Sequence, residues 1–533
     1  MAKKGKSNKT LSNASPGFSA NSSNSTPAST VDLSLGGDPI PPHLEKQILY
    51  LTISTDKHKR DEIAASPLLT VPALDAGAPT QYGVIGRDSS KSGQSFSSLS
   101  MYKRHILSMR IFQNVSAPSS TFICGSQGSG KSNTLACLLE NCLLPSDLGN
   151  LPHPLTGIVF HYDSFNSDLG GIPCEAAYLA SNKNVKVRIL CSPTNVRTIT
   201  LSDRDLTTTH MHDLMTVGES GMPLYMHVVD RVLRELKIEQ DEQNLPFNYE
   251  KFKRRIFQSE LTSMQTNPLK QRLDTLESFM PRNDSNKKTP GTASGNDWTA
   301  KPGQLTVVDL SCPCVTPDMA CWLFKIALQL FLKGDMTTGR IVALDEAHKY
   351  MRDTSGGSRA LTERLLEVVR NQRHQGARVI ISTQEPTVSP KLLDLCSVTV
   401  VHRFTSPDWL HVLQGHLAGL SPITALVGDT NVTADGEEHK KIHYGAQPID
   451  LMGRNNAMEL FGLIVGLETG QALVFSPSTI VGIKDDQGGG GGTTNGNNKK
   501  RDAGSVERLG NRALLVNIRA RMTEDGGRSI MAL

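Results

Sequence analysis

The sequence has few of the features that mark membrane-spanning, secreted or zinc-ribbon proteins. Aromatic residues make up only 5% of its 533 residues, and no apolar run approaches the roughly 18 residues needed to cross a bilayer. The first residues are basic but lack the apolar stretch of a secretory signal. The nine cysteines are scattered and form no CxxC pair, which argues against a disulfide framework and a zinc ribbon. We therefore expect an intracellular protein without a membrane segment, and the sequence does not distinguish nucleus from cytoplasm.

The net charge is small and unevenly distributed. The whole chain carries +4. Residues 1–30 contribute +4 and residues 499–533 contribute another +4, which leaves −4 for residues 31–498. The body of the protein has no overall basic field. A nucleic-acid partner would therefore have to meet a local patch, an assembled channel or the tails.

Composition divides the chain into four parts. Residues 1–40 form a basic, Ser- and Asn-rich tail that we expect to be disordered, because it has too little apolar area to offset the entropy of ordering. Residues 41–103 are a small N-terminal segment with weak β character. Residues 104–482 form the main domain, with a helical insertion at about 202–303. Residues 483–533 combine a Gly-rich linker with a basic tail, whose apolar stretch could pack on its own core or brace a neighbouring subunit.

The main domain reads as an α/β fold. Short apolar runs alternate with amphipathic helices, which is typical of a parallel-rich sheet covered by helices on both faces. Helices are predicted from 131 to a stop at Pro145, from Thr316 to Gly334, and from about 359 to 375. The predicted strands are 121–124, 157–162, 305–310, 340–344, 379–382 and 398–402, with an edge strand near 185–189.

One motif predicts a phosphate-binding loop. A complete G-x-x-x-x-G-K-[ST] sequence lies between a predicted strand and a predicted helix, the context that this chemistry requires. Its glycines let backbone N–H groups converge on phosphates at a helix N-terminus. The lysine would neutralise β and γ oxygens, and the final serine could ligate Mg²⁺. The nucleotide-binding residues are Gly125, Ser126, Gln127, Gly128, Ser129, Gly130, Lys131 and Ser132.

A second motif predicts the hydrolytic acids. The strand 341–344 runs directly into Asp345 and Glu346, which places both carboxylates at the carboxyl edge of the sheet, beside the phosphate loop. Asp345 is the expected Mg²⁺ residue, and Glu346 is the expected catalytic residue that orients or deprotonates water. No guanine-reading NKxD follows the loop, so ATP is favoured over GTP.

Two further catalytic candidates follow. Gln384 ends the strand 379–383, which we expect to lie between the loop strand and the acidic strand; it could sense the γ-phosphate or hold the lytic water. A plain strand-end turn is the alternative. Arg373 lies near the end of a helix together with Arg370. Pairing of cations with a helix end explains both arginines, and a charge supplied to a neighbouring subunit's ATP explains Arg373 equally well.

The order of these motifs resembles the HerA/FtsK class of P-loop ATPases. Residues 345–348 read DEAH, the motif of a helicase superfamily, but the sequence lacks the Ser-Ala-Thr element and the arginine-rich sixth motif of those helicases. We therefore do not assign the chain to them. The resemblance spans residues 104–482. It is carried by the loop itself, by FHYD at 160–163, by LTVVDLS at 305–311, by RHQG at 373–376 leading into VIISTQEP, and by LETGQA at 467–472. An N-terminal β-barrel, common in HerA-like members, is not evident.

The resemblance implies a RecA-like core that assembles as a homo-hexameric ring and translocates double-stranded DNA with MgATP. It also implies that Arg373 acts in trans, and it leaves room for a nuclease or another protein partner. Lys251, Lys253, Arg254 and Arg255 in the insertion are candidates for a DNA-contacting belt or, alternatively, a solvated helix face. The competing functions are a nucleotide-gated protein-interaction or assembly ATPase without DNA, and an ATP-binding protein that hydrolyses slowly.

Overall fold

A computed structural model describes much of the chain from Thr55 onward. The described residues are 55–90, 98–164, 174–192, 199–216, 225–281, 295–334, 337–352, 355–417, 448–449, 457–484 and 505–525, and all belong to one unit, Ser54–Leu533. The expected tail at 1–40 and the glycine run of the linker lie outside the described residues.

The parallel-rich sheet predicted from the apolar runs is confirmed. Seven neighbouring strands run parallel in the order β11-β4-β10-β9-β6-β8-β7. Most are wholly buried, because helices cover both faces and every position of such a strand is core. β7 is the edge strand, as expected. Their bounds are β4 Ser120–Cys124, β6 Thr156–His161, β7 Lys186–Cys191, β8 Gln304–Asp309, β9 Arg340–Leu344, β10 Ala377–Thr383 and β11 Val398–Val401.

The strand order follows the RecA-like pattern. β10 pairs with β4 on one side and with β9 on the other, so one strand separates the strand before the phosphate loop from the strand before the acids. The position predicted for the strand that ends at Gln384 is therefore confirmed. Cys124, Leu344 and Thr383, which end these three strands, lie at the same edge.

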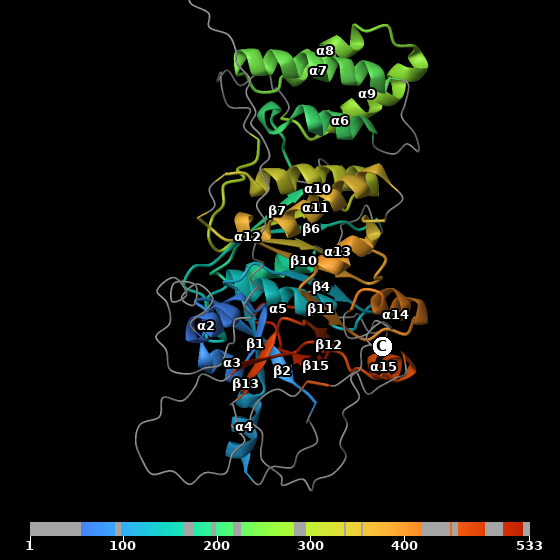
Figure 1. The fold of residues 1–533 in the computed structure, drawn as a ribbon. Coiled ribbons are helices and arrows are strands. Elements are labelled where there is room, and N and C mark those ends of the chain that lie inside the picture. The colour runs from blue at the N-terminus through green and yellow to red at the C-terminus, as the bar shows by residue number, and fades with distance from the viewer. Residues whose placement is uncertain are drawn as a thin grey trace, which may run out of the picture. The chain divides into compact units, whose positions relative to one another are not determined.

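Helices cover the two faces of the sheet (Figure 1). On one face, α5 Lys131–Leu143 and η1 Glu175–Ser181 enclose one apolar core with the sheet. The other face carries α10 Pro317–Leu332, α11 Gly356–Arg370, α13 Pro390–Leu395, α14 Pro407–Gln414 and α15 Ala457–Val465. The single helix expected at 359–375 is divided at Asn371, where the short α12 Gln372–Gln375 begins. Gly376 ends it in the left-handed conformation, at φ 56°.

The insertion is helical where it is described. It comprises η2 Asp203–Asp205, α6 Thr208–Thr216, α7 Met226–Gln243, α8 Tyr249–Phe257 and α9 Ser263–Ser278. It packs on α10 through a shared apolar core. Trp322 Nε1 donates to the carbonyl of His210 at 3.0 Å, and Lys325 pairs with Asp213 at 2.5 Å. The insertion is therefore anchored to the helix that covers the parallel strands.

The remaining strands extend the sheet with a mostly antiparallel half, in the order β14-β13-β1-β3-β2-β15-β12. These strands come from two distant parts of the chain: residues 68–114 supply β1 to β3, and residues 471–518 supply β12 to β15. The strands of this half are β1 Leu68–Thr70, β2 Tyr82–Asp88, β3 Arg110–Asn114, β12 Gln471–Phe475, β13 Ile480–Lys484, β14 Ser505–Arg508 and β15 Ala513–Ile518. The short strand β5 Gly149–Asn150 pairs with β2. Three helices belong to the same part of the chain as β1 to β3: α2 Thr55–Ala65, α3 Val71–Ala76 and α4 Leu99–Ser108.

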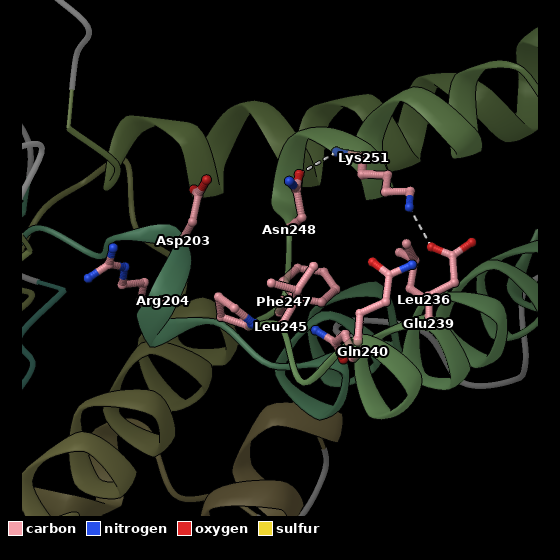
Figure 2. A pocket seen from close by; sticks show the side chains of 11 residues that line it. Asp203, Arg204, Leu236, Glu239, Gln240, Leu245, Phe247, Asn248 and Lys251 are labelled. Carbon is pink, nitrogen blue, oxygen red and sulfur yellow. Dashed lines mark hydrogen bonds and ion pairs between the residues drawn. The ribbon is translucent and has the colours of Figure 1, made fainter. Parts of the chain in front are cut away.

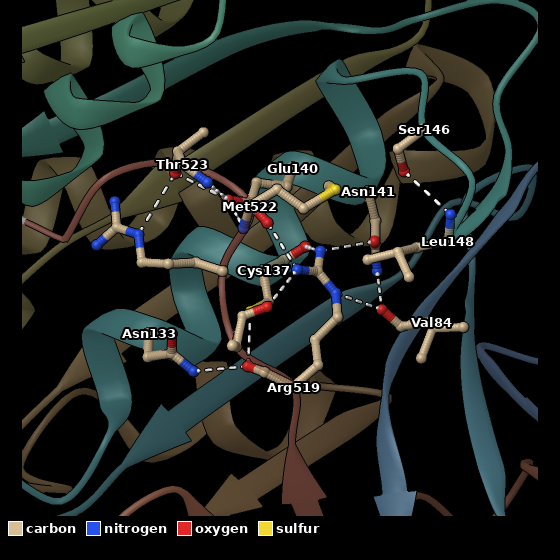
Figure 3. Close-up of polar contacts among 12 residues, drawn as sticks. Val84, Asn133, Cys137, Glu140, Asn141, Ser146, Leu148, Arg519, Met522 and Thr523 are labelled. Carbon is tan, nitrogen blue, oxygen red and sulfur yellow. Dashed lines mark hydrogen bonds and ion pairs between the residues drawn. The ribbon is translucent and has the colours of Figure 1, made fainter. Parts of the chain in front are cut away.

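The C-terminal segment 505–525, expected as part of a basic tail, is an ordered part of the fold. β15 pairs with β12 and β2, and its Ala513, Leu514 and Val516 are fully buried in the core. Beyond β15 the chain crosses α5, where the fully buried carboxylate of Glu140 pairs with Arg519 at 2.7 Å and accepts the N–H groups of Met522 and Thr523 at 2.9 Å each (Figure 3). The segment therefore packs on its own core.

Among the described residues, no helix combines the length and the apolar character that a membrane crossing requires.

Candidate nucleotide-binding site

The predicted phosphate loop joins β4 to α5 in a conformation that needs glycine. Gly125 and Gly130 have φ of 150° and 112°, which L side chains rarely adopt. A Cβ on Gly125 would lie 2.6 Å from Cβ of His402, and one on Gly130 would lie 3.1 Å from the backbone nitrogen of Gly470. These glycines therefore let two neighbouring segments approach the loop closely.

Hydrogen bonds from two other segments hold the loop in place. The backbone N–H and the hydroxyl of Ser126 both donate to the carbonyl of Arg403 at 2.8 Å. Ser129 Oγ donates to the carbonyl of Ser126 at 2.7 Å, and the Gly470 N–H donates to the carbonyl of Ser129 at 3.1 Å. The turn at 467–472, part of the family resemblance, thus lies directly on the loop.

His402 fastens the first turn of α5. It is fully buried. Its Nδ1 lies 2.9 Å from the carbonyl of Gln471, which can only accept, so Nδ1 carries the proton and Nε2 accepts the Thr134 hydroxyl at 2.8 Å. Burial lowers the pKa of His402 to about 4. The ring is therefore neutral at physiological pH. Sequence reasoning missed this role, although His402 ends a predicted strand.

Lys131 begins α5 and lies almost wholly within the site. Its side chain is 5% exposed, and Nζ donates to the carbonyl of Ser126 at 3.0 Å. Burial lowers the pKa of Lys131, and the negative charges of Glu346 and Asp345 oppose that shift. Lys131 therefore interacts electrostatically with both acids, which follow β9 more than 200 residues later in the sequence.

Asp345 is held by two side chains that sequence reasoning missed. Its Oδ2 lies 3.1 Å from Nδ1 of His161 and 3.6 Å from Sγ of Cys174, and the three ligand atoms lie within 4.8 Å of one another. Burial alone would raise the pKa of Asp345, but the hydrogen bond and positive charge of His161 lower it. His161 is the second residue of the FHYD motif, which drew attention only for its acid. The carboxylate is therefore kept ionised and fixed in orientation.

Glu346 has an unusual backbone and a carboxylate oxygen without a donor. Its φ of 50° places a non-glycine residue in the left-handed region. Oε1 accepts from Gln384 Nε2 at 3.3 Å. Oε2 lies 3.3 Å from Nδ1 of His348, but that nitrogen accepts the Gln384 N–H, so it offers no proton. Oε2 is thus buried without a hydrogen-bond donor among the described residues. Burial and the charge of Asp345 raise the pKa of Glu346.

The remaining residues of the predicted site do not all lie near the phosphate loop and the acids. Ser132 is half-buried in the first turn of α5, next to Lys131, while Gln127 and Gly128 are exposed at the tip of the loop. Arg373 is exposed on α12, which precedes β10, whereas Gln384 follows it. A strand of that length separates them by about 20 Å. The site therefore brings together the loop, the acids and Gln384 but not the Arg373 of the same chain.

The cationic cluster in the insertion is largely paired. Lys251 contacts Glu239 at 2.5 Å across a pocket between α7 and α8 (Figure 2), Lys253 contacts Glu277 at 2.5 Å, and Arg255 contacts Glu239 at 2.5 Å. Three of the four candidate cations are thus neutralised by acids of neighbouring helices. This pattern favours the solvated-face interpretation over a DNA-contacting belt.

The site fits a magnesium-bound nucleoside triphosphate. The glycine loop opens onto a helix N-terminus, Lys131 supplies a positive charge, and Ser132 with Asp345 supplies oxygen ligands of the kind that Mg²⁺ prefers. The orphaned Oε2 of Glu346 faces the same edge. Fold and site together define a P-loop NTPase with RecA-like strand order. The RecA-like core that the resemblance implies is confirmed by the order of the motif-bearing strands.

Comparison with known proteins adds distant structural likenesses. VirB4 of Thermoanaerobacter pseudethanolicus aligns with 76% of this chain and 97% of its own, at 12% identity and a TM-score of 0.41. The bacterial conjugative coupling protein TrwB aligns over 67% and 82%, at 12% identity and 0.37. The genome-packaging NTPase B204 of Sulfolobus turreted icosahedral virus 2, bound to ATPγS, aligns over 32% and 61%, at 13% identity and 0.20. No protein-family model and no curated protein matches the chain. At such TM-scores the likenesses carry no argument, and the class rests on the strand order and the site.

Proposed function

We propose that the protein hydrolyses ATP at the edge of β4, β10 and β9. The observation that carries the proposal is the buried Oε2 of Glu346, which has no donor and lies in a site that Lys131 and Asp345 make suitable for a triphosphate. A carboxylate oxygen in this state is suited to accept a proton from water. The absence of a guanine-reading motif favours ATP over GTP.

The residues divide the work as follows. Mg²⁺, held by Ser132 and Asp345, would neutralise charge on the β and γ oxygens. Lys131 leaves the carbonyl of Ser126 and binds the same phosphates, while loop N–H groups hold the remaining oxygens. Gln384 orients Glu346 through Oε1, and Glu346 Oε2 takes the proton from the attacking water. His161 and Cys174 keep Asp345 in a fixed orientation.

The test is phosphate release from the full-length protein with MgATP. Lys131→Ala should reduce turnover to background, whereas Lys333→Ala, at an exposed lysine following α10, should retain the wild-type rate. Wild-type protein that binds no nucleotide, or Lys131→Ala with normal turnover, would remove the proposal.

We further propose that the ATPase works as a homo-hexameric ring that moves double-stranded DNA, with Arg373 completing a neighbour's site. The exposure of Arg373 and its distance from the site of its own chain support an action in trans. A ring would repeat a few cations around a pore, which reconciles a net-acidic body with a polyanion. Mass measurement with and without ATP tests the ring. ATPase stimulation by duplex DNA at low salt tests the substrate, and hydrolysis without any stimulation would contradict it.

One observation favours a second candidate, a nucleotide-gated assembly ATPase whose cargo is a protein. Lys251, Lys253 and Arg255 lie on α8, the most cationic helix of the described chain. All three are already paired with acids, so α8 is less suited to contact DNA. Partners that remain bound after nuclease treatment, together with an ATPase rate indifferent to DNA, would support this candidate. Loss of those partners with the nucleic acid would exclude it.

A further inference from the structure

A cavity of about 460 Å³ lies between the late turn at 468–470 and strands β2 and β15. Its volume is in the range of small-molecule sites. Its walls mix apolar and polar side chains from four separate segments, which is typical of ligand sites rather than of packing defects. Those that the argument uses are Val84, Arg87, Ile106, Arg110, Glu468 and Asn517.

Two walls of this cavity touch the phosphate loop and its helix. Gly470 lines the cavity, and its N–H donates to the carbonyl of Ser129. Arg519 lines the cavity as well, and its carbonyl accepts from Asn133 Nδ2 at 3.0 Å, one residue beyond Ser132 (Figure 3). The cavity therefore lies next to segments that contact the phosphate loop, beside β15 and β2, which are on the opposite side of β4 from β9 and its acids.

The charge of the cavity also calls for a ligand. Arg87 on β2 and Arg110 on β3 face each other in register, and both line the cavity. Like charges directly opposite on neighbouring strands are destabilising, and neither arginine has an ion-pair partner in the parts of the chain that the structure describes. Guanidinium planes stack on nucleobases, and carboxylate and amide groups such as those of Glu468 and Asn517 hydrogen-bond to base or ribose.

The C-terminal wall is held firmly. Arg519 donates to Glu140 at 2.7 Å, to the carbonyl of Val84 at 2.8 Å and to Asn141 Oδ1 at 3.1 Å. Since Glu140 lies in the last turn of α5, the helix that begins at the phosphate loop, the wall and the loop share one helix as support. The cavity is thus fixed relative to the loop.

We propose that this cavity, walled by the C-terminal segment, β2 and the turn at 468–470, binds the nucleoside of the nucleotide whose phosphates occupy the loop. The inference rests on the proposed function. Val84 and Ile106 contact the base, and Glu468 and Asn517 supply polar contacts. Arg87 stacks on the base, because the Arg110 guanidinium already lies over the Phe112 ring at 5.3 Å and donates to the carbonyl of Leu107 at 2.8 Å. The C-terminal residues beyond β14, which sequence reasoning read as a tail, are in this account part of the ATP site.

The test compares Mg²⁺-bound ATP with inorganic triphosphate, which has no nucleoside, on the full-length chain. Ile106→Trp fills the cavity, and Leu107→Trp places the same side chain at the next, 52% exposed position of α4 as the matched control. Because base stacking accounts for large affinity differences, Ile106→Trp should weaken ATP by about tenfold or more and leave triphosphate within about twofold. Leu107→Trp should change neither.

A second variant guards against a fold defect in the first. Arg87→Ala leaves the cavity open and should also weaken ATP and spare triphosphate, which shows at the same time that the loop is intact. Equal weakening of both ligands would mean that the cavity serves phosphates, and unchanged ATP affinity in Ile106→Trp and Arg87→Ala would mean that it serves no nucleotide; either result overturns the inference. Wild-type protein that binds neither ligand would instead refute the proposed function.

Discussion

Replacing Glu346 by glutamine is the sharpest perturbation of the proposed chemistry. In Glu346→Gln the amide oxygen can keep the 3.3 Å contact with Gln384 Nε2, and the new amide N–H₂ lies where Oε2 was, 3.3 Å from His348 Nδ1. The single lone pair of that nitrogen already accepts the Gln384 N–H, so the variant gains no hydrogen bond there. It removes a buried carboxylate charge whose Oε2 has no donor and should therefore fold at least as stably. The amide cannot take a proton from water. Loss of general-base catalysis should slow turnover by roughly 10²- to 10⁴-fold, or about 2.7 to 5.4 kcal/mol of activation free energy.

The assay measures phosphate release at saturating MgATP beside the equilibrium affinity for ATP. Affinity should stay near the wild-type value, so that the variant holds ATP without hydrolysing it. Glu385→Gln, one residue beyond Gln384, is the matched control and should turn over normally. A Glu346→Gln variant with a rate within about threefold of the wild type, far short of the loss expected for a general base, would refute the role of Glu346.

Three further predictions concern stability and assembly. Arg519→Met leaves the buried Glu140 carboxylate without its cation and should lower the free energy of unfolding by about 3–5 kcal/mol in urea titrations, with partial recovery in the double variant with Glu140→Gln. His402 has a folded-state pKa of about 4, below its ordinary 6.5, so its contribution to the free energy of unfolding is fully present above pH 6.5 and is lost as pH falls toward 4. Over that interval the free energy of unfolding should fall by up to about 3 kcal/mol more in the wild type than in His402→Gln. Equal slopes of unfolding free energy against pH would contradict the assignment. Arg373→Ala should cut turnover by about a thousandfold at unchanged ATP affinity, with Arg370→Ala as control; normal turnover would exclude a role in trans.

The parallel half of the fold could be predicted because local signals agree with it. Continuous apolar runs, the cap at Thr316 and the motif positions all point to buried strands crossed by helices. The antiparallel half could not be predicted. β15 pairs with β2 through contacts between residues more than 400 positions apart, and no local period encodes such a pairing. The break at Asn371 was missed because the residues on both sides of it favour helix.

The candidate site divides in the same way. Its loop and acids follow short patterns with a known chemistry, so they could be named without coordinates. His161, Cys174 and His402 act through contacts made only in three dimensions. A lone histidine at a strand end, or a lone cysteine before a short helix, carries no sequence signal of such contacts. The candidate cations Lys251, Lys253 and Arg255 were overestimated for the same reason, since their acidic partners lie on the neighbouring helices α7 and α9.

The central claim is that Lys131 and the acids that follow β9 serve one magnesium-bound nucleotide. The most direct measurement is ATP affinity with and without Mg²⁺ for the wild type and for Asp345→Asn. The account predicts that Mg²⁺ strengthens binding to the wild type and that Asp345→Asn loses most of that gain. An equal gain from Mg²⁺ in both proteins would show that the metal and the nucleotide do not meet at Asp345.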